Sequence, residues 1–249
     1  MPTARERARV AFTADLLAAA RARLAADGPA QLSLRAVARD LGVASSAVYR
    51  YVPSRDALLT LLIIEAYDQA GGACEEAADA ARARGLPPGQ VYLAVARGFR
   101  RWALEHRSSF ELVYGTPVPG YAAPQDTVPH AIRVWRVLVG IVIAASADGS
   151  WRPTGPAAAG TASDASLVDP GTVELGQAVA RAAGLEVSIE PADVVATIAL
   201  FTAMLGAVTA ELFGHLHRVA ADHPRVFDVL VATAATGAGL PVDLAAEAP

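Results

Sequence analysis

The chain has 249 residues, of which 53% are hydrophobic, and its net charge at neutral pH is −4. A chain of this length and composition can bury one large core or two smaller ones, which excludes disorder of the whole chain. The single cysteine, Cys74, excludes an internal disulfide, and no secretory leader pattern is visible, so we expect a cytoplasmic protein.

The composition also indicates the fold class and the distribution of charge. Alanine is abundant, every basic residue is arginine, and runs of β-branched residues are short, which together predict an all-α fold. Residues 1–60 contain nine arginines and five acidic residues, a net charge of +4, so the rest of the chain carries −8. A basic N-terminal part before an acidic body indicates a polyanionic partner for the N-terminal part alone.

The N-terminal part begins with two helical patterns. Apolar residues three and four positions apart form one stripe in residues 9–26, which predicts a helix that the following Asp-Gly-Pro sequence ends. A second stripe predicts a helix over residues 34–41, with Ser33 as its expected cap. Gly42 follows at a position where helices commonly end in a left-handed conformation.

A third short helix is expected to be capped by Ser45 and to run to about Tyr51. Its Val48 is expected to face inward, and the outward-facing residues are expected to be Ser46, Ala47, Tyr49 and Arg50. Two short helices joined by a turn of three or four residues that contains glycine form a helix-turn-helix, so residues 34–51 are interpreted as this motif. Pro53 ends the third helix, because the residue before a proline is disfavoured in the helical region. Ser54 then caps a long fourth helix that leads into the body.

The body is expected to be helical as well. The fourth helix ends at the proline-rich sequence of residues 85–89, and residues 149–171 are rich in small and polar residues, which predicts a long mobile loop. The apolar stretch of residues 137–147 is too short to span a bilayer, so we interpret it as a buried core helix and expect no membrane association. Helices are predicted over residues 55–84, 90–106, 108–114, 124–147, 171–184, 191–217 and 224–237.

The run from Leu32 to Leu59, LSLRAVARDLGVASSAVYRYVPSRDALL, resembles the DNA-binding domain of the TetR family of repressors. In that family a threonine or serine opens helix two, Gly-Val makes the turn, and a Tyr-x-Tyr or Tyr-x-His pair closes helix three before helix four. In the body, Trp102 and the sequence FELVYGTPVPGY of residues 110–121 are similar to an actinobacterial branch of such regulators. The resemblance implies a helix-turn-helix DNA-binding domain over residues 1–60 and a helical effector-binding and dimerisation domain over residues 61–249.

The resemblance and the chemistry of the side chains together assign roles in binding double-stranded DNA. Short side chains near the N-terminus of a recognition helix reach base edges in the major groove. Tyrosine hydroxyls can reach phosphates, and the family typically holds the DNA backbone at the positions of Arg35 and Arg55, whereas for Arg50 a guanine and a backbone contact stay open. The candidate DNA-binding residues are Arg35, Ser45, Ser46, Ala47, Tyr49, Arg50, Tyr51 and Arg55.

The alternative to a DNA-binding surface is a packing motif. Short helix-turn-helix pairs occur in enzymes and in packing modules, and Tyr49 taken alone would more often be half-buried core than a DNA contact. The local charge of +4 and the family resemblance favour DNA.

The body contains aromatic residues that a small-molecule sensor would need. In family members the pocket lies among the middle helices, although each of these residues taken alone would more often be plain core. Charged residues are scarce in the predicted helices 90–106 and 124–147, which favours a largely apolar effector with one polar handle. The candidate ligand-binding residues are Trp102, Phe110, Tyr114, Trp135 and Phe201, with Met204 as a soft filler.

Small residues recur at helical spacing in the last two predicted helices, where they would let another helix approach closely. The family pairs these two helices with those of a second subunit in a four-helix bundle, which implies a homodimer. A face buried within one chain is the alternative. The small residues are Ala203, Gly206, Ala207, Ala210 and Gly214 in one helix and Ala232, Ala235 and Gly237 in the other.

Other chemistry has little support in the sequence. Glu211 and His215 share one helical face, but His217 points elsewhere, and two ligands do not make a metal site. No phosphate-binding glycine loop, nucleophile-elbow serine or His-Glu-x-x-His motif is visible, so we expect no catalytic residues, no metal and no cofactor. A redox role is conceivable for Cys74, but a buried, unreactive thiol is favoured.

These observations lead to one functional hypothesis and two alternatives. The hypothesis is a ligand-responsive transcriptional regulator, a repressor, that binds a palindromic operator as a dimer. The first alternative is a helical binding module of the same fold that lost either DNA recognition or ligand response. The second is a small helical enzyme, against which the absence of a catalytic constellation counts.

Overall fold

The computed structural model describes residues 3–152, 165–182 and 188–245. These residues form helices and no strand, so the predicted all-α fold is confirmed. The backbone divides into two compact units, unit 1 with Met1–Gln69 and Glu105–Ala131, and unit 2 with Ala70–Leu104 and Ile132–Pro249. The domain boundary expected after residue 60 stays a prediction.

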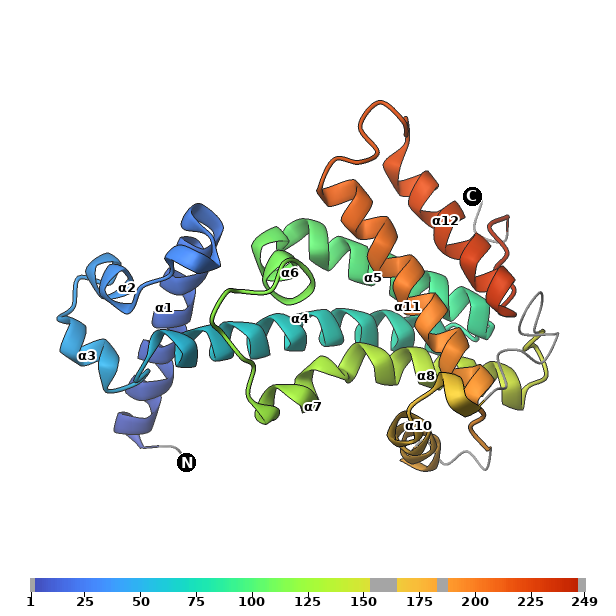
Figure 1. Ribbon diagram of the computed structural model, residues 1–249, viewed down its shortest axis with the longest axis horizontal. Helices are drawn as coiled ribbons and strands as arrows, with labels where there is room; N and C mark the ends of the chain where they lie inside the picture. Colours follow the sequence, from blue (N-terminus) through green and yellow to red (C-terminus); the bar gives the residue numbers. More distant parts are fainter. Residues whose placement is uncertain (1–2, 153–164, 183–187, 246–249) are drawn as a thin grey trace. The chain divides into compact units, whose positions relative to one another are not determined.

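Unit 1 contains the helix-turn-helix. In Figure 1, α2 and α3 lie beside the longer α1. The first part of α4 belongs to this unit, and its later part belongs to unit 2. The elements of unit 1 are α1 (Ala4–Asp27), η1 (Pro29–Gln31), α2 (Leu34–Asp40), α3 (Ser45–Tyr49), the start of α4 (Arg55–Ala83), α6 (Arg107–Tyr114), η2 (Gln125–Thr127) and α7 (Val128–Ala131).

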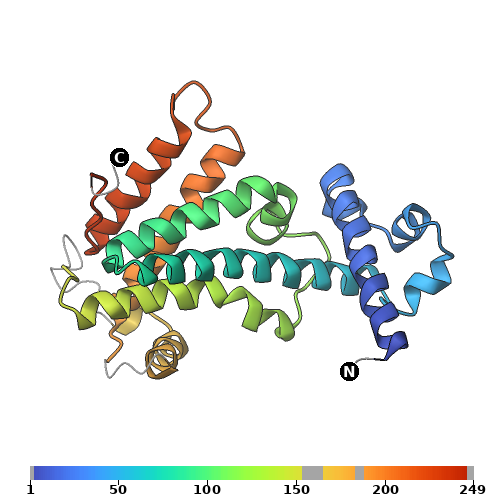
Figure 2. The same ribbon diagram turned by 180° about the vertical axis from the view of Figure 1, so that it is seen from behind.

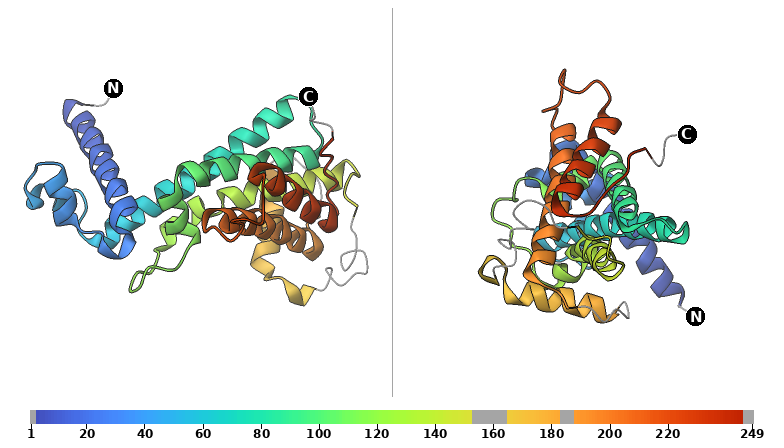
Figure 3. Two further views of the ribbon diagram at one scale, coloured as in Figure 1. Left: turned by 90° about the horizontal axis from the view of Figure 1, so that it is seen from above. Right: turned by 90° about the vertical axis from the view of Figure 1, so that its right-hand side faces the viewer.

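Unit 2 is a bundle of longer helices. Figure 2 shows the later part of α4 running alongside α5 and α8. α11 and α12 pack against each other and run in opposite directions (Figure 1), and α10 packs against α8 and α11. The right-hand view of Figure 3 shows α10, in yellow, below α11, in orange. The further elements of unit 2 are α5 (Pro88–Glu105, all but its last residue), α8 (Arg133–Ala147), η4 (Ala165–Leu167), α10 (Pro170–Ala182), α11 (Pro191–Leu212) and α12 (His223–Ala238).

Several predicted helix ends were wrong. α1 begins five residues earlier than expected, because Thr3 and Glu6 form a capping box in which each side chain accepts a hydrogen bond from the other's backbone N–H. The helix predicted over residues 124–147 is divided into η2, α7 and α8. α11 ends at Leu212 rather than at residue 217, and Gly214 beyond it has a left-handed φ of 76°. Of the expected loop of residues 149–171, residues 153–164 lie outside the described residues. The prediction was wrong at its end, where η4 covers residues 165–167 and α10 begins at Pro170.

The expected caps of the helix-turn-helix were right in part. Ser54 Oγ accepts a hydrogen bond from Ala57 N at 3.0 Å, and Gly42 has the expected left-handed φ of 67°. Ser33 occupies the cap position of α2 but its side chain accepts no capping hydrogen bond. Ser45 is the first helical residue of α3 rather than its cap, which is Ala44. The turn therefore depends on backbone conformation and core packing more than on serine caps.

The two short helices are held by a shared core and by one ion pair. Val37 in α2, Val48 in α3 and Leu58 in α4 are completely buried in the core of unit 1. Arg23 in α1 donates from Nε and Nη2 to the two carboxylate oxygens of Asp40, both at 2.6 Å. This paired geometry positions the end of α2 against α1.

Close packing in unit 2 depends on glycines at helix contacts. A Cβ atom added to Gly71 of α4 would lie 2.6 Å from Cβ of Arg133 in α8, closer than two carbon atoms can approach. Gly98 of α5 makes a similarly close contact with α4, because a Cβ atom added to it would lie 3.0 Å from the carbonyl oxygen of Ala73. Cys74 is completely buried between these contacts, and burial raises the pKa of its thiol to about 12, which keeps it unreactive.

One helix of the described part, α11, is long and apolar enough to cross a membrane by length and composition, and η2 to α8 would pass only as a bent pair. The core helix of a soluble protein passes the same test. α11 packs against α8, α10 and α12, as a core helix does.

The Gly71 contact makes a testable prediction. Gly71→Ala should lower the free energy of unfolding by about 1–3 kcal/mol, because the new methyl group forces α8 away from α4. Gly72→Ala is the matched control, since its Cβ would meet nothing closer than Arg133 Nη2 at 4.0 Å. Because the alanine at position 72 meets no clash, it should raise the free energy of unfolding by about 0.5–1 kcal/mol through its better helix propensity. Denaturant unfolding measures both, and equal effects of the two changes would contradict the packing account.

Candidate DNA-binding surface and ligand pocket

The recognition helix α3 exposes one face to solvent. Val48 is completely buried, whereas Ser46, Tyr49 and Arg50 are exposed, with Tyr49 at 44%. Ser45 and Ala47 are partly buried. The orientation predicted for this helix, with Val48 inward and the polar side chains outward, is confirmed, apart from the partial burial of Ala47.

Two of the predicted DNA-binding residues have clear roles inside unit 1. The ring of Tyr51 packs against Phe12 of α1, with 4.5 Å between centroids. The Arg55 guanidinium donates to the carbonyl oxygens of Pro29 at 2.8 Å and Leu32 at 3.2 Å. Arg55 therefore ties the first turn of α4 to the segment between α1 and α2. Sequence reasoning did not reveal this structural role, because the carbonyl acceptors carry no side-chain signature.

The free positive charge of unit 1 lies on fewer arginines than the sequence count indicated. Arg21 pairs with Glu65 at 2.6 Å, and Arg23 pairs with Asp40. Arg35 and Arg50 are exposed and form no ion pair within the described part of the chain. These two side chains are thus available to an external anion.

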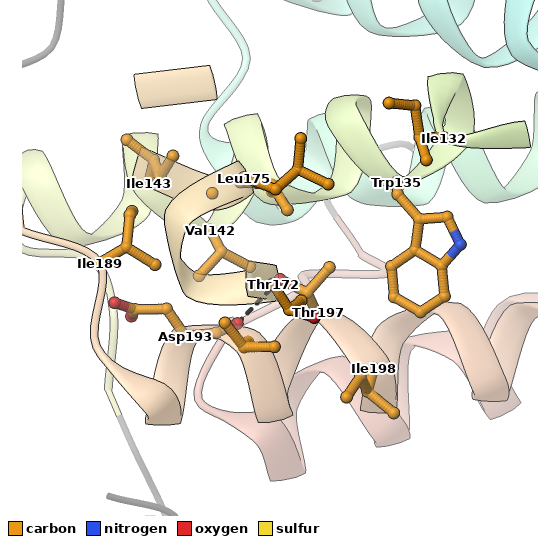
Figure 4. A pocket seen from close by; sticks show the side chains of 13 residues that line it. Ile132, Trp135, Val142, Ile143, Thr172, Leu175, Ile189, Asp193, Thr197 and Ile198 are labelled. Carbon is orange, nitrogen blue, oxygen red and sulfur yellow. Dashed lines mark hydrogen bonds between the residues drawn. The ribbon is translucent and has the colours of Figure 1, made fainter. Parts of the chain in front are cut away.

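A pocket of about 330 Å³ opens in unit 2 between α8, α10 and α11. Figure 4 shows its side chains, which are mostly apolar. Thr197 in the wall donates its hydroxyl hydrogen to the backbone carbonyl of Asp193 at 2.8 Å. The lining residues are Ile132, Trp135, Val139, Val142 and Ile143 of the α8 region, Thr172, Leu175 and Gly176 of α10, and Ile189, Asp193, Val194, Thr197 and Ile198 around the start of α11.

Among the described lining residues, Asp193 is the one with an ionisable side chain. Its Oδ2 atom accepts a hydrogen bond from Glu190 N at 2.9 Å, as part of the capping box that starts α11. Burial is the main cause that raises the pKa of Asp193, and the nearby charge of Glu190 raises it further. Hydrogen bonds from Glu190 N–H and from the Ser146 hydroxyl act in the opposite direction.

The structure separates the aromatic residues that sequence reasoning grouped as ligand-binding. Trp135 lines the pocket, and Phe201 packs against it with 4.4 Å between ring centroids. Met204 is completely buried in α11 and does not line the pocket. A role of these three residues in ligand binding stays a prediction.

The other three candidates lie elsewhere. Trp102 is buried in α5 against Phe99, with 5.6 Å between centroids. Phe110 and Tyr114 belong to α6 in unit 1, where their rings are 5.5 Å apart. None of these three residues is among those that line the pocket. Sequence reasoning missed the part of the pocket wall that comes from α10 and from the start of α11. It did so because apolar periodicity alone does not distinguish a pocket wall from a core.

The acid and the histidines considered as a metal site do not cluster. Glu211 accepts from Arg100 Nε at 2.7 Å and from Nη2 at 2.6 Å, which ties α11 to α5. His215 and His217 are exposed beyond the end of α11. Among the described residues, no group of three histidine, cysteine or acidic side chains could hold a metal ion.

The small residues of the last two helices divide between two environments. Ala207 of α11 and both Ala232 and Ala235 of α12 are buried within the chain. Gly206 and Gly237 are exposed, alongside exposed apolar side chains of the same two helices. These exposed apolar residues are Ile198 in α11 and Val229 and Leu230 in α12, with Phe213 just beyond α11.

An exposed recognition helix in one unit and an apolar pocket in the other define a helix-turn-helix DNA-binding protein with a helical body. Residues 16–62 match the family model described as bacterial regulatory proteins of the tetR family. Residues 92–234, more than half of the chain, match the tetracyclin repressor-like C-terminal domain. The chain therefore belongs to the TetR family of transcriptional regulators, as the sequence resemblance implied.

Curated relatives agree with this assignment. The HTH-type transcriptional regulators Rv1816 of Mycobacterium tuberculosis and Mb1846 of Mycobacterium bovis are each 42% identical to the chain over 151 residues. The alignment covers 60% of this chain and 64% of each relative, which is less than two thirds of their length.

Solved structures show the same fold. SCO4313, described as a regulatory protein, has a TM-score of 0.68 and 25% identity, with 94% of this chain and 98% of that chain covered. The TetR family regulator PfmR of Thermus thermophilus has a TM-score of 0.57 and 15% identity, with 89% and 97% covered. At such identities the likeness to PfmR concerns the fold alone.

The contacts of Arg55 make a second prediction. Arg55→Ala should destabilise the helix-turn-helix by about 1–2 kcal/mol, because two carbonyl groups lose a charged donor that is only a third exposed. Hydrogen exchange of the amides in α2 and α3 measures this local stability. Arg50→Ala is the control, because Arg50 is exposed and makes none of these contacts. Equal exchange in the two variants would show that the Arg55 contacts add no stability.

Proposed function

We propose that the protein is a ligand-responsive repressor that binds a palindromic operator as a homodimer and acts in the cytoplasm through DNA binding rather than catalysis. The observation that carries the proposal is the combination, in one chain, of an outward-facing recognition helix and a separate apolar pocket. The recognition helix would bind DNA, and the pocket would bind the small molecule that controls this binding.

On DNA, the exposed face of α3 would enter the major groove. Ser45, Ser46 and Ala47 stand at the start of that helix, where short side chains reach base edges. Tyr49 and Arg50 follow on the exposed face, and Tyr49 can donate its hydroxyl hydrogen to a phosphate.

The residues around α3 would hold the DNA backbone. Arg35 in the first turn of α2 is exposed and has no ion pair within the described residues. It can therefore pair with a phosphate without breaking an internal ion pair. Tyr51 and Arg55 contribute mainly by holding α3 in place, through Phe12 and through the carbonyl groups before α2. We retain both as candidate backbone contacts, since each is only partly buried.

The homodimer would form through α11 and α12. Exposed Val229 and Leu230 of α12, with Phe213 just beyond α11, give these helices an apolar outer surface, and Gly206 and Gly237 would let a second pair of helices approach closely. A two-fold dimer presents two recognition helices to two half-sites, which explains the expected palindrome.

Repression would be relieved by the ligand. A ligand can shift the dimer away from its DNA-competent arrangement only if it binds the other arrangement more tightly. A tenfold preference at each pocket corresponds to about 1.4 kcal/mol, so two pockets in a dimer would supply about twice that.

The alternative of a binding module of the same fold that has lost DNA recognition is less well supported. Such a module would have no need of a polar recognition helix, yet Ser46, Tyr49 and Arg50 are exposed on α3. A module without ligand response would keep the DNA surface and lack a use for the pocket. The experiments below distinguish these cases.

The dimer interface can be tested with one matched pair of variants. Val229→Asp places a charge on α12 at a side chain that is 46% exposed, and Val128→Asp places it on α7 at one with the same 46% exposure. Light scattering should show a dimer for the native chain and for Val128→Asp, and a shift toward monomer for Val229→Asp. A native monomer at micromolar concentration, or a dimer unaffected by Val229→Asp, would contradict the proposed interface.

Base and phosphate contacts should respond differently to substitution. The operator can be found by sequencing the DNA fragments that the purified protein retains. Tyr49→Phe should weaken binding to all sequences by a similar factor, whereas Ser46→Ala should change which bases are preferred. Anisotropy titrations against the operator and single-base variants measure both effects. An altered base preference with Tyr49→Phe, and none with Ser46→Ala, would reverse the assignment.

Ligand response can be followed through Trp135, which lines the pocket. A small apolar compound that fills the pocket should raise the melting temperature, change the tryptophan fluorescence and weaken operator binding. Leu175→Phe narrows the pocket from α10 and should abolish all three effects, whereas Leu104→Phe, at an exposed residue of α5 outside the lining, should preserve them. If no compound of a broad apolar panel raises the melting temperature, the ligand response is disproved and a DNA-binding dimer remains.

A further inference from the structure

The described lining of the pocket contains an acidic side chain but no basic one. Among the thirteen lining residues in the described part of the chain, Asp193 is the one with an ionisable side chain, and no arginine or histidine is among them. The causes that act on its pKa are burial, hydrogen bonds from Glu190 N–H and the Ser146 hydroxyl, and the charge of Glu190. The described lining therefore offers an ionised Asp193 no basic partner.

Other ionisable groups nearby do not change this sign. Glu190, at the cap of α11, adds negative charge beside Asp193. Glu174 of α10 is exposed and lies next to the lining residue Leu175, whereas Arg136 of α8 is exposed and is not part of the lining. An anion entering the pocket would be repelled by Asp193 and would lose its hydration without gaining a donor of opposite charge.

The carboxylate is held in place but keeps room for a ligand. Asp193 Oδ2 accepts from Glu190 N, and the Ser146 hydroxyl also donates to this carboxylate. A carboxylate offers about four acceptor positions on its two oxygen atoms, so about two stay open to a ligand. Because the side chain lies in a mostly apolar wall, a cation beside it would be attracted more strongly than one at the protein surface.

The charge also lies at one end of the pocket. Figure 4 shows Asp193 near Ile143 and Ile189, and Trp135 at the opposite end beside Ile198. A molecule lying along the pocket would thus place a polar group at the Asp193 end and an apolar group against the indole ring. A volume of about 330 Å³ corresponds to a compact ligand, at the lower end of the range for small-molecule sites.

We propose that this pocket selects apolar amines, bound as ammonium ions with Asp193 as their counter-ion, over neutral and acidic molecules of the same shape. The inference rests on the proposed ligand response and adds the chemical class of the effector. The ammonium group donates hydrogen bonds to the carboxylate, and the apolar part of the ligand fills the pocket toward Trp135. No covalent step is involved.

The experiment compares three probes that share a skeleton, phenylbutylamine, phenylbutanol and phenylbutanoic acid. Each is titrated into the full-length native protein, with tryptophan fluorescence and calorimetry as readouts. The amine should bind about tenfold more tightly than the alcohol, because a charge-assisted hydrogen bond replaces a neutral one, and the acid should bind weakest.

Asp193→Asn tests the residue itself. Asparagine has the same shape and can still accept the hydrogen bond from Glu190 N, so α11 should keep its start. This variant should lose the preference for the amine while keeping the binding of the alcohol. Glu174→Gln removes one negative charge from an exposed position of α10 outside the lining and should leave the preference unchanged. Retained binding of the alcohol shows that the Asp193→Asn variant is folded.

The outcomes separate this inference from the proposed ligand response. Equal binding of the three probes, tighter binding of the acid, or an amine preference that survives Asp193→Asn would overturn the role of Asp193 while leaving a ligand pocket in place. Failure of the amine to bind the native protein would overturn it as well. The ligand response would fail separately, if no apolar compound of any charge affected melting temperature or operator binding.

Discussion

The close approach of α8 to α4 at Gly71 is the contact on which the geometry of unit 2 depends. Because Gly71 has no side chain, the backbone of α8 can bring Arg133 against α4, and Arg133 Nε then donates to Glu75 Oε1 at 2.9 Å. The ion pair and the glycine contact together hold the first turn of α8 against α4. Ile132 and Trp135, in or just before that turn, belong to the pocket lining, so the position of this part of the wall depends on the packing of α8.

The pocket in turn depends on α10, which also contributes Ala180 to a small buried cluster of unit 2. α10 packs against α8 and α11 and closes the apolar surface that these two helices share. Ile189, just before α11, contributes both to a small buried cluster with Val194 and to the pocket lining. A fully apolar wall would bind apolar molecules without selection by charge. Asp193, placed there by the capping box of α11, gives the wall a polar end.

α4 is the helix that supplies residues to both units. Ser54 caps this helix and Arg55 begins it, beside the helix-turn-helix. In its later turns, Gly71 lies against α8 and Ala73 lies against α5. A ligand in unit 2 can affect DNA binding only through a difference in its affinity for two arrangements of the dimer.

The local signals that the sequence contains proved reliable where they depend on a few neighbouring residues. Gly42 and Ser54 take the predicted turn and cap, and the pattern around Val48 correctly predicts which face of α3 is buried. Ser33 and Ser45 show the limit of such signals, because a serine at the right position need not accept the capping hydrogen bond.

Features that depend on distant residues could not be predicted. Arg55 looks like a phosphate ligand in the sequence, and only the fold shows the carbonyl groups that it contacts. Trp102 and Trp135 are equally plausible pocket residues by type, but they lie on different helices and only Trp135 reaches the pocket among the described residues. Likewise, Glu190 and Asp193 could have been recognised as a capping box, but not as neighbours of a pocket.

The central claim is that the pocket and the DNA surface are coupled through one equilibrium. Calorimetry can measure the affinity of a pocket ligand for the free protein and for the protein saturated with operator DNA, and anisotropy can measure the operator affinity with and without that ligand. Linkage requires the two ratios to be equal, so a tenfold loss of DNA affinity must appear as a tenfold loss of ligand affinity on DNA, about 1.4 kcal/mol. We expect equal ratios well above one; a ligand that binds the pocket with the same affinity in both states would contradict the account.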